Sequence, residues 1–372
     1  MTRSVKFGLI FFCSTAGLLF MRILFSFIAL SDNLLNWMFS LLMQGVFLGL
    51  VPYLLYRALF RGEKSFLADC RVRPKVHPLS YLIAFVLGLL CFVINMAVST
   101  LWYILMQTAG YTYSSSVGTI FSSPEVLIFE ILFTAVMPAL FEELVDRGVL
   151  LAALDDLPGD KIKILIIGIG FGLVHQNAPQ LVPTMVGGLI MAYMAVKSDS
   201  IVPGMIVHFL NNFLVILVDF GDQKGNIIGK IYHAFWEFYA QNLLVMLAIA
   251  AVLTAATVGL LKVFAKINLP YRKQRPAALS IPSADAEFER IYRMSAGRPM
   301  PHDTPEAAPY VTTIGYDGFV RRVPRPDMAA PQTQQPPLPQ AKRGSGDYVF
   351  VVLAFAMTAV TTVITYFCGV LR

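Results

Sequence analysis

Five ionisable side chains interrupt apolar segments of this chain: Glu142, Glu143, Arg147, His175 and His208. Placing a charged side chain at the centre of a bilayer costs about 2.5–3.5 kcal/mol or more, so such residues usually have a function there. A carboxylate beside an imidazole can take a proton from water, and imidazole and amide groups can donate hydrogen bonds to a developing oxyanion. These residue types predict hydrolysis of an amide bond within a membrane.

The candidate residues lie at similar depths along their segments. Glu142 lies 13 residues before the polar turn that begins at Asp155, and His175 lies 12 residues after Lys163. His208 lies 11 residues after the lysine that ends the preceding apolar segment. At 1.5 Å per helical residue, these offsets correspond to about 16–20 Å from one membrane face. We expect the three side chains to meet around one small polar cavity.

Helical spacing gives several of these residues a partner. Side chains four residues apart share a helix face, as three pairs do here: Glu143 with Arg147, Phe171 with His175, and His208 with Asn212. The first pair can form a charge-assisted hydrogen bond, which leaves Glu142 to face the cavity. The last pair can converge on one ligand atom. Phe171 would provide an apolar wall beside His175.

The composition identifies a multi-pass membrane protein. Of the 372 residues, 56% are hydrophobic and 14% are charged, and the mean hydropathy is +0.65. This leaves too little polar surface for a soluble globule. We expect an all-α polytopic bundle of about nine transmembrane helices. The expected spans are residues 7–30, 36–57, 80–107, 128–154, 163–179, 181–197, 201–219, 241–265 and 348–370.

The chain divides into four parts by composition. We expect an N-terminal helix pair with a basic loop at 1–79, a core with one following helix at 80–265, and a C-terminal membrane anchor at 347–372. Residues 266–346 are expected to be a disordered cytoplasmic linker, since thirteen of the 22 prolines lie there. Its Pro-rich sequence is a candidate binding site for a partner domain.

The distribution of basic residues predicts the orientation in the membrane. Six Lys or Arg residues lie between Arg57 and Pro78, whereas none lies between Gln107 and Pro124. Short loops rich in Lys and Arg usually remain in the cytoplasm. We therefore expect a multi-pass protein of the cell membrane with its N-terminus in the cytoplasm.

Three short motifs resemble those of the CPBP family of CAAX-processing and bacteriocin-processing intramembrane endopeptidases, also called the Abi or type II CAAX prenyl protease group. Residues 142–148 resemble the EExxxR motif, 171–175 the FxxxH motif and 208–212 the HxxxN motif. The resemblance covers about residues 80–220, and the order of the three motifs makes it specific. One position departs from the family pattern: Asp146 stands before the arginine, where the family usually has an aromatic residue.

The resemblance implies a role for each motif residue. Glu142 and His175 would activate the water, while His208 and Asn212 would form the oxyanion hole. Glu143, Arg147 and Phe171 would support or orient these groups, although Asp146 can compete for Arg147. The substrate would be a peptide or protein associated with the lipid bilayer, and no nucleic acid is expected to bind.

Alternatives remain open for the cofactor and for the function. We expect no cofactor, but members of this family were long described as metalloproteases. Zinc held by Glu142, His175 and His208 is the alternative. Ionisable residues at one depth also suit a proton-coupled transporter. A third alternative is a non-catalytic membrane immunity or scaffold protein.

Overall fold

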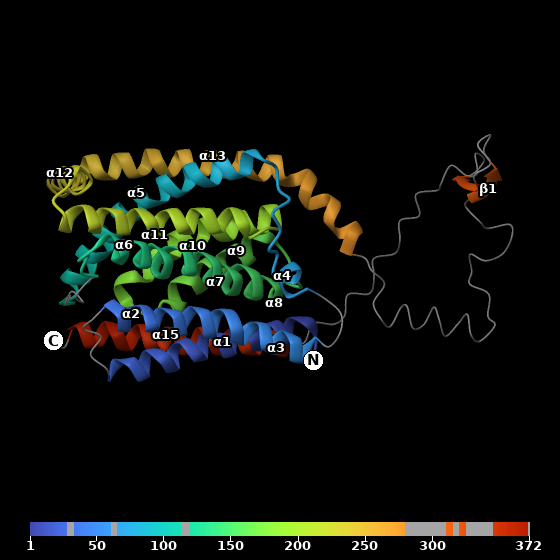
Figure 1. The fold of residues 1–372 in the computed structure, drawn as a ribbon, viewed down its shortest axis with the longest axis horizontal. Helices are drawn as coiled ribbons and strands as arrows, with labels where there is room; N and C mark the ends of the chain where they lie inside the picture. Colours follow the sequence, from blue (N-terminus) through green and yellow to red (C-terminus); the bar gives the residue numbers. More distant parts are fainter. Residues whose placement is uncertain are drawn as a thin grey trace. The chain divides into compact units, whose positions relative to one another are not determined.

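The computed structural model describes residues 1–27, 33–60, 65–112, 119–279, 310–314, 320–324 and 345–370. The chain divides into two units, Met1–Lys273 with Ser345–Arg372, and Gln274–Gly344. The described part of the first unit is built from helices, most of which lie roughly parallel to one another (Figure 1). This confirms the predicted helical membrane bundle.

The first half of the bundle contains three long apolar helical stretches. The first is α1 (Arg3–Ser26). The second is divided into α2 (Asn33–Ser40), the π-helical segment η1 (Leu41–Leu50) and α3 (Val51–Leu59). After the short α4 (Phe66–Asp69), the third stretch is the continuous helix α5 (Leu79–Thr108).

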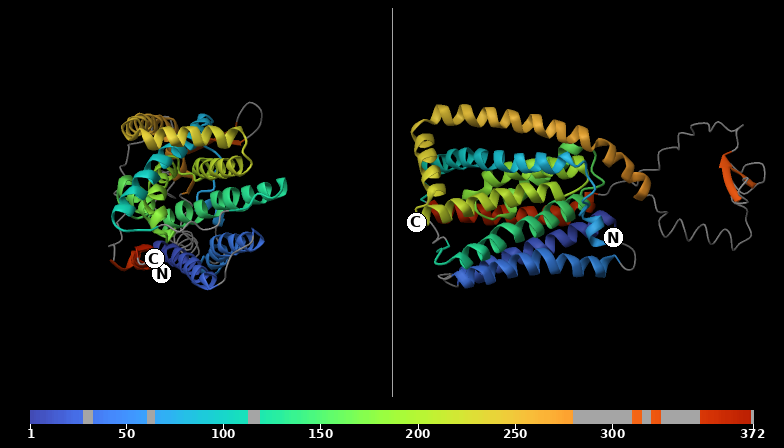
Figure 2. Two further views of the ribbon diagram at one scale, coloured as in Figure 1. Left: turned by 90° about the vertical axis from the view of Figure 1, so that its left-hand side faces the viewer. Right: turned by 45° about the horizontal axis from the view of Figure 1, so that its top comes forward.

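The second half of the bundle contains the segments with the candidate residues. One stretch is divided into α6 (Pro124–Glu130), η2 (Ile131–Val136), α7 (Met137–Glu143), η3 (Leu144–Val149) and α8 (Leu150–Ala153). The others are α9 (Asp160–Val174), α10 (Ala178–Ser198), α11 (Val202–Gln223), α12 (Ile227–Gln241), α13 (Leu243–Leu279) and α15 (Val349–Val370), which follows the 3₁₀ turn η4 (Ser345–Tyr348). Figure 2 shows α12 lying across the ends of α11 and α13.

Eight helical stretches of the described residues are long and apolar enough to cross a membrane, one fewer than the nine expected. The difference is at 163–179, where α9 ends at Val174 after only 15 residues. Gln176 adopts a left-handed backbone conformation, with φ of 50°, and Pro179 then lies in the first turn of α10, a position that proline favours. The chain therefore reverses after His175 and returns as α10.

Glycines allow α9 and α10 to pack closely. A Cβ atom at Gly172 would lie 2.6 Å from the Leu181 carbonyl oxygen and 2.3 Å from Met185 Cγ. A Cβ atom at Gly188 would lie 2.9 Å from the Gly168 carbonyl oxygen. Distances below 3 Å are not tolerated without movement, so only glycine permits this approach. The close contact fixes the position of the end of α9, where Phe171 and His175 lie.

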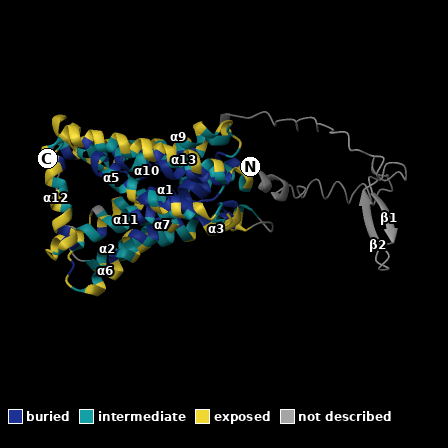
Figure 3. Ribbon diagram, turned by 90° about the horizontal axis from the view of Figure 1, so that it is seen from above, coloured by how far each residue is buried: buried dark blue, intermediate teal, exposed yellow. Residues whose placement is uncertain are grey.

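The apolar core joins helices from both ends of the chain. Its largest cluster includes Phe11 of α1, Leu150 of α8, Ala195 of α10 and Ala354 of α15, all of which are buried. Figure 3 shows buried residues concentrated towards the interior of the bundle, with exposed residues on its outer helices. The C-terminal helix α15, which the sequence predicts as a membrane anchor, contributes to this core.

Ion pairs connect the turns at the end of the bundle that contains the N-terminus, here called the basic end. Arg71 pairs with Asp155 and with Asp199, and Arg73 also pairs with Asp199. Burial lowers the pKa of Arg71, but the two aspartates outweigh this effect and raise it overall. The segment after α4 is therefore tied to the turns that precede α9 and α11.

Helix α13 extends beyond residue 265, where we expected the core to end. Asn268 is buried and donates a hydrogen bond to Ser80 Oγ at 2.7 Å. Arg272 forms two hydrogen bonds with Asp160, at 2.9 and 3.0 Å. These contacts place the boundary of the first unit at Lys273.

The second unit contains an antiparallel strand pair, β1 (Tyr310–Ile314) and β2 (Val320–Pro324), with Tyr310 opposite Pro324. This pair and the end of α13 differ from the wholly disordered linker expected over 266–346. Residues 280–309, 315–319 and 325–344 of that linker, with the Pro-rich sequence, lie outside the described residues.

Candidate active site

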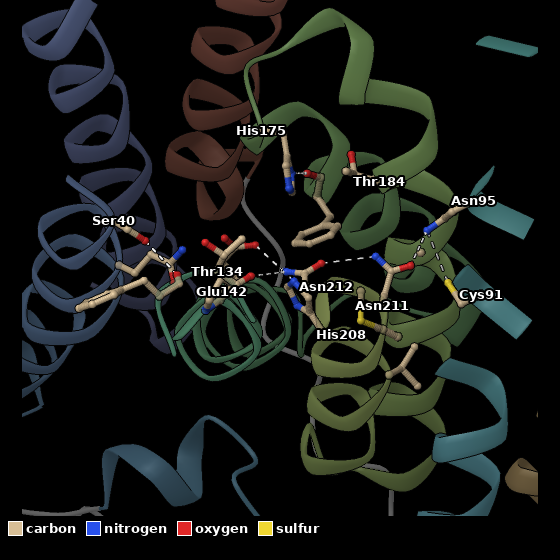
Figure 4. Close-up of a pocket in the computed structure, with 17 residues that line it drawn as sticks. Ser40, Cys91, Asn95, Thr134, Glu142, His175, Thr184, His208, Asn211 and Asn212 are labelled. Carbon is tan, nitrogen blue, oxygen red and sulfur yellow. Dashed lines mark hydrogen bonds and ion pairs between the residues drawn. The ribbon is translucent and has the colours of Figure 1, made fainter. Parts of the chain in front are cut away.

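The residues predicted from the sequence to form the site line one cavity of about 260 Å³ within the bundle. Its lining includes Glu142 from α7, His175 from the end of α9, and His208 and Asn212 from α11. Phe171 also contributes to the wall. Figure 4 shows Glu142, His175, His208 and Asn212 around the same space. The convergence expected from their common depth is therefore present in the structure.

Glu143 lies at the centre of a buried ionic network behind this cavity. Its Oε1 atom accepts hydrogen bonds from Arg147 Nη1 at 2.8 Å and from His208 Nδ1 at 2.9 Å. Glu143 and Arg147 are fully buried, and the guanidinium lies 3.8 Å above the centre of the Phe171 ring. Such a pair is stable only when each charge has good partners. The network therefore fixes the orientation of His208.

Asp146 does not take Arg147 away from Glu143. Its side chain is buried, and Oδ1 has no hydrogen-bond partner in the structure. The ion pair between Arg147 and Glu143 is intact beside it. The departure from the family pattern thus leaves the expected partnership of Arg147 unchanged.

The hydrogen bond of His175 determines which of its ring nitrogens is available to the cavity. Nδ1 lies 2.7 Å from the Phe171 carbonyl oxygen. A carbonyl can only accept, so the proton of a neutral His175 is on Nδ1 and the lone pair is on Nε2. The Phe171 ring also contacts His175 edge to face, with 4.7 Å between the ring centres. His175 is therefore prepared to accept a hydrogen bond through Nε2.

Glu142 keeps more freedom than Glu143. Its side chain is 20% exposed, and Oε2 lies 3.8 Å from His208 Nε2, which is longer than a hydrogen bond. The adjacent glutamates thus have different environments: Glu143 is held by two donors, while Glu142 faces the cavity. A carboxylate in the second situation can accept a proton from a bound molecule.

Asn212 belongs to a chain of three side-chain amides. Asn95 Nδ2 donates to Asn211 Oδ1 at 3.2 Å, and Asn211 Nδ2 donates to Asn212 Oδ1 at 3.4 Å. Asn212 Nδ2 in turn donates to the Thr134 carbonyl oxygen at 3.1 Å. Its second N–H remains available to a molecule in the cavity.

The sequence reasoning missed Asn95 and assigned no chemistry to Asn211, yet both line the cavity. Asn95 is a polar side chain within the apolar span expected at 80–107, and this position could have identified it as a candidate site residue. Its Oδ1 atom is buried without a partner. The sequence alone does not reveal that α5 lies beside α11, which brings these amides together.

The described residues give no support to the zinc alternative. No group of three His, Cys, Asp or Glu side chains among them is placed to hold a metal ion. Glu142, His175 and His208 line one cavity, but they do not converge as ligands of a single ion.

Comparison with protein families agrees with this arrangement. Residues 124–214 match the family model described as Type II CAAX prenyl endopeptidase Rce1-like. The match extends from the start of α6 into α11 and includes all three motifs. It is consistent with a CPBP family intramembrane protease and supports an intramembrane endopeptidase of the CAAX type. No match was found among curated proteins or solved structures.

Proposed function

We propose that this protein hydrolyses a peptide bond of a membrane-associated protein or peptide. The observation that best supports the proposal is the convergence of Glu142, His175, His208 and Asn212 on one cavity of the Rce1-like domain. A base and hydrogen-bond donors around one small polar space are the groups that amide hydrolysis requires. The cavity lies among helices of membrane-spanning length, which suits a substrate delivered by the bilayer.

In this mechanism, Glu142 and His175 act on one water molecule. The Glu142 carboxylate accepts a proton from the water, and the water oxygen forms a bond to the carbonyl carbon of the scissile peptide. His175 Nε2 accepts the second hydrogen bond of that water and orients its lone pair. When the C–N bond breaks, the proton on Glu142 passes to the leaving nitrogen, which completes the hydrolysis.

His208 and Asn212 form the oxyanion hole in this proposal. Asn212 donates its second amide N–H to the developing oxyanion. His208 already uses Nδ1–H towards Glu143, so it must carry a second proton on Nε2 to donate into the cavity. The carboxylates of Glu142 and Glu143 balance the positive charge of that imidazolium. Preorganised donors of this kind typically contribute about 10²–10³ in turnover each.

Arg147 and Phe171 act through Glu143 and the two histidines. The Arg147 guanidinium holds one side of the Glu143 carboxylate and lies over Phe171. Phe171 in turn contacts both histidine rings edge to face. We assign these residues, with Glu143, to positioning the histidines.

The proposal is tested by peptide cleavage in proteoliposomes. Wild-type protein should cleave members of a quenched fluorescent library of membrane peptides. Glu142→Gln should lower the rate by about 10²–10⁴, because general-base catalysis is lost. Glu125→Gln is the matched control, since Glu125 is exposed in the first turn of α6, and it should cleave like wild type.

Equal cleavage by Glu142→Gln and wild type would reject Glu142 as the base. Absence of cleavage, together with proton-driven uptake of solutes into the vesicles, would favour the transporter alternative. Absence of both activities would favour a binding or scaffold function.

A further inference from the structure

A second cavity of about 200 Å³ adjoins the proposed catalytic cavity. The two cavities share Ser40, Gln44, Glu142 and His175 in their walls. The second cavity is also lined by Arg22. Arg22 comes from α1, outside the 124–214 segment that matches the family model. A cationic side chain from the N-terminal helix thus reaches a space next to the proposed catalytic residues.

Arg22 has few hydrogen-bond partners for a charged residue in an apolar helix. Among the described residues, the guanidinium makes one hydrogen bond, from Nη1 to the Gln176 carbonyl oxygen at 3.5 Å. A guanidinium has five N–H donors and favours planar, bidentate acceptors. Helix side chains lean towards the N-terminus, so the Arg22 side chain extends back along α1 from its position late in that helix, and it lines the cavity with Glu142 and His175. Most of its donors remain available to a bound group.

No neighbouring carboxylate of the described residues makes a direct ion pair with Arg22. Glu142 lines the same cavity, but no ion pair within 4 Å joins it to Arg22 among the described residues, and its Oε2 atom lies 3.8 Å from His208 Nε2. Gln44, which lines both cavities, has a buried Oε1 atom without a hydrogen-bond partner. The wall between the proposed catalytic cavity and Arg22 therefore contains uncommitted hydrogen-bonding groups.

We propose that Arg22 and the cavity around it form a subsite for a carboxylate of the bound peptide. This inference rests on the proposed function, because it places the carboxylate beside the scissile bond. A planar carboxylate matches the guanidinium, and the Gln44 amide can bond to the peptide backbone between the two cavities. The carboxylate has two sources: an acidic side chain or the C-terminal carboxyl group. The subsite would give the protein a preference for anionic peptides.

Binding measurements can test the subsite independently of cleavage. The probe is an apolar octapeptide with an uncharged BODIPY label on its N-terminus, in three forms: with a C-terminal carboxylate, with a C-terminal carboxamide, and with a carboxamide and one internal aspartate at each position in turn. Fluorescence anisotropy is measured with the full chain in lipid nanodiscs. Wild type should bind at least one carboxylate form about tenfold more tightly than the uncharged peptide. The form that gains affinity identifies the source.

The variants separate recognition from structure. Arg22→Gln should remove the preference and leave the affinity for the uncharged peptide unchanged, while Arg22→Lys should keep part of it. Arg57→Gln removes the same charge from exposed α3, away from this cavity, and should keep the full preference. If Arg22→Gln weakens all peptide forms equally, Arg22 has a structural role or balances Glu142, and the subsite is wrong.

Two further outcomes would also overturn the subsite: equal binding of all forms by wild type, or no measurable binding of any form. If the preference is present but no peptide is cleaved, the proposed function fails while the subsite stands. If cleavage occurs without the preference, the proposed function stands and the subsite fails.

Discussion

The adjacent residues Glu142 and Glu143 have different environments, and this difference fits their different proposed roles: Glu142 as the general base and Glu143 as the residue that positions His208. Oε1 of Glu143 receives both a guanidinium and an imidazole N–H, whereas Glu142 is partly exposed to the cavity. Consecutive helix positions differ by about 100° around the axis, so one residue can face the network and the other the cavity. The sequence could predict this division from the four-residue spacing of Glu143 and Arg147.

Asn212 offers a prediction at the residue scale. Asn212→Ala should lower peptide-cleavage turnover by about 10²–10³, because one oxyanion donor is lost. Its thermal unfolding in detergent should stay close to wild type, since the side chain is only half-buried and its two hydrogen bonds, to the Thr134 carbonyl oxygen and from Asn211 Nδ2, are both longer than 3 Å. Asn242→Ala is the control, because Asn242 bonds to the Phe238 carbonyl oxygen at the end of α12. Full turnover by Asn212→Ala would remove the oxyanion role.

The helices position the site through local backbone geometry that their residue spacing does not predict. The rise of a helix was enough to predict that Glu142, His175 and His208 share a level. It did not predict that α9 ends at Val174, because the reversal depends on the backbone at Gln176. Nor did it reveal the π-helical segment η2, which contains Thr134, the acceptor for Asn212.

The close packing of α9 and α10 can be tested with a single methyl group. Gly172→Ala should lower stability by about 1–3 kcal/mol, since the added Cβ meets Leu181 and Met185. It should also slow cleavage, because His175 follows on the same helix. Gly259→Ala is the matched control: Gly259 lies in α13, and its added Cβ meets nothing within 4 Å. Unfolding temperatures and cleavage rates of both variants check the prediction, and equal stability would contradict it.

The ion pairs of Asp160 predict how the stability of the basic end changes at low pH. Hydrogen bonds from Arg272, with Lys197 also contributing, lower the pKa of Asp160 to about 2 at the first residue of α9, outside the eight candidate spans. The pKa of Asp160 in the folded protein is below its ordinary value near 3.8, so the ionised carboxylate stabilises the folded state. This stabilisation is fully present above pH 3.8 and disappears as the pH falls through about 2. It adds about 1–2 kcal/mol to the free energy of unfolding, after allowance for solvent screening.

Thermal unfolding of wild type and Asp160→Asn between pH 6 and pH 2 measures this contribution. The two proteins should differ most near pH 6 and become similar near pH 2. A constant difference over the whole range would show that the carboxylate charge of Asp160 is not what stabilises this end.

At the scale of the whole molecule, the sequence could predict the class and the location of the site. Apolar length and composition gave a helical membrane bundle, and three motifs gave the helices that line the cavity. The roles of Asn95 and Arg22 depend on which helices are neighbours, and one sequence does not contain that information. The end of α13 was misplaced because its Pro-containing, basic sequence resembles a linker, whereas Asn268 and Arg272 pack onto the bundle.

The orientation of the bundle is a prediction for the whole molecule. We expect the basic end, which contains the N-terminus, to face the cytoplasm. Green fluorescent protein fused before Met1 should therefore fluoresce in cells, and alkaline phosphatase fused at the same position should be inactive. Because α1 and α15 carry the two ends of the chain to opposite ends of the bundle (Figure 1), alkaline phosphatase fused after Arg372 should be active. The reverse pattern would show the opposite orientation.

The central claim is that Glu142 and His175 act on the same water molecule in one cavity. Single-turnover cleavage rates of Glu142→Gln, His175→Ala and the double variant test this claim most directly. If the two residues act as a unit, the double variant should be no slower than the slower single variant. If the losses of the two single variants multiply in the double variant, the residues act independently, and the shared-water account is contradicted.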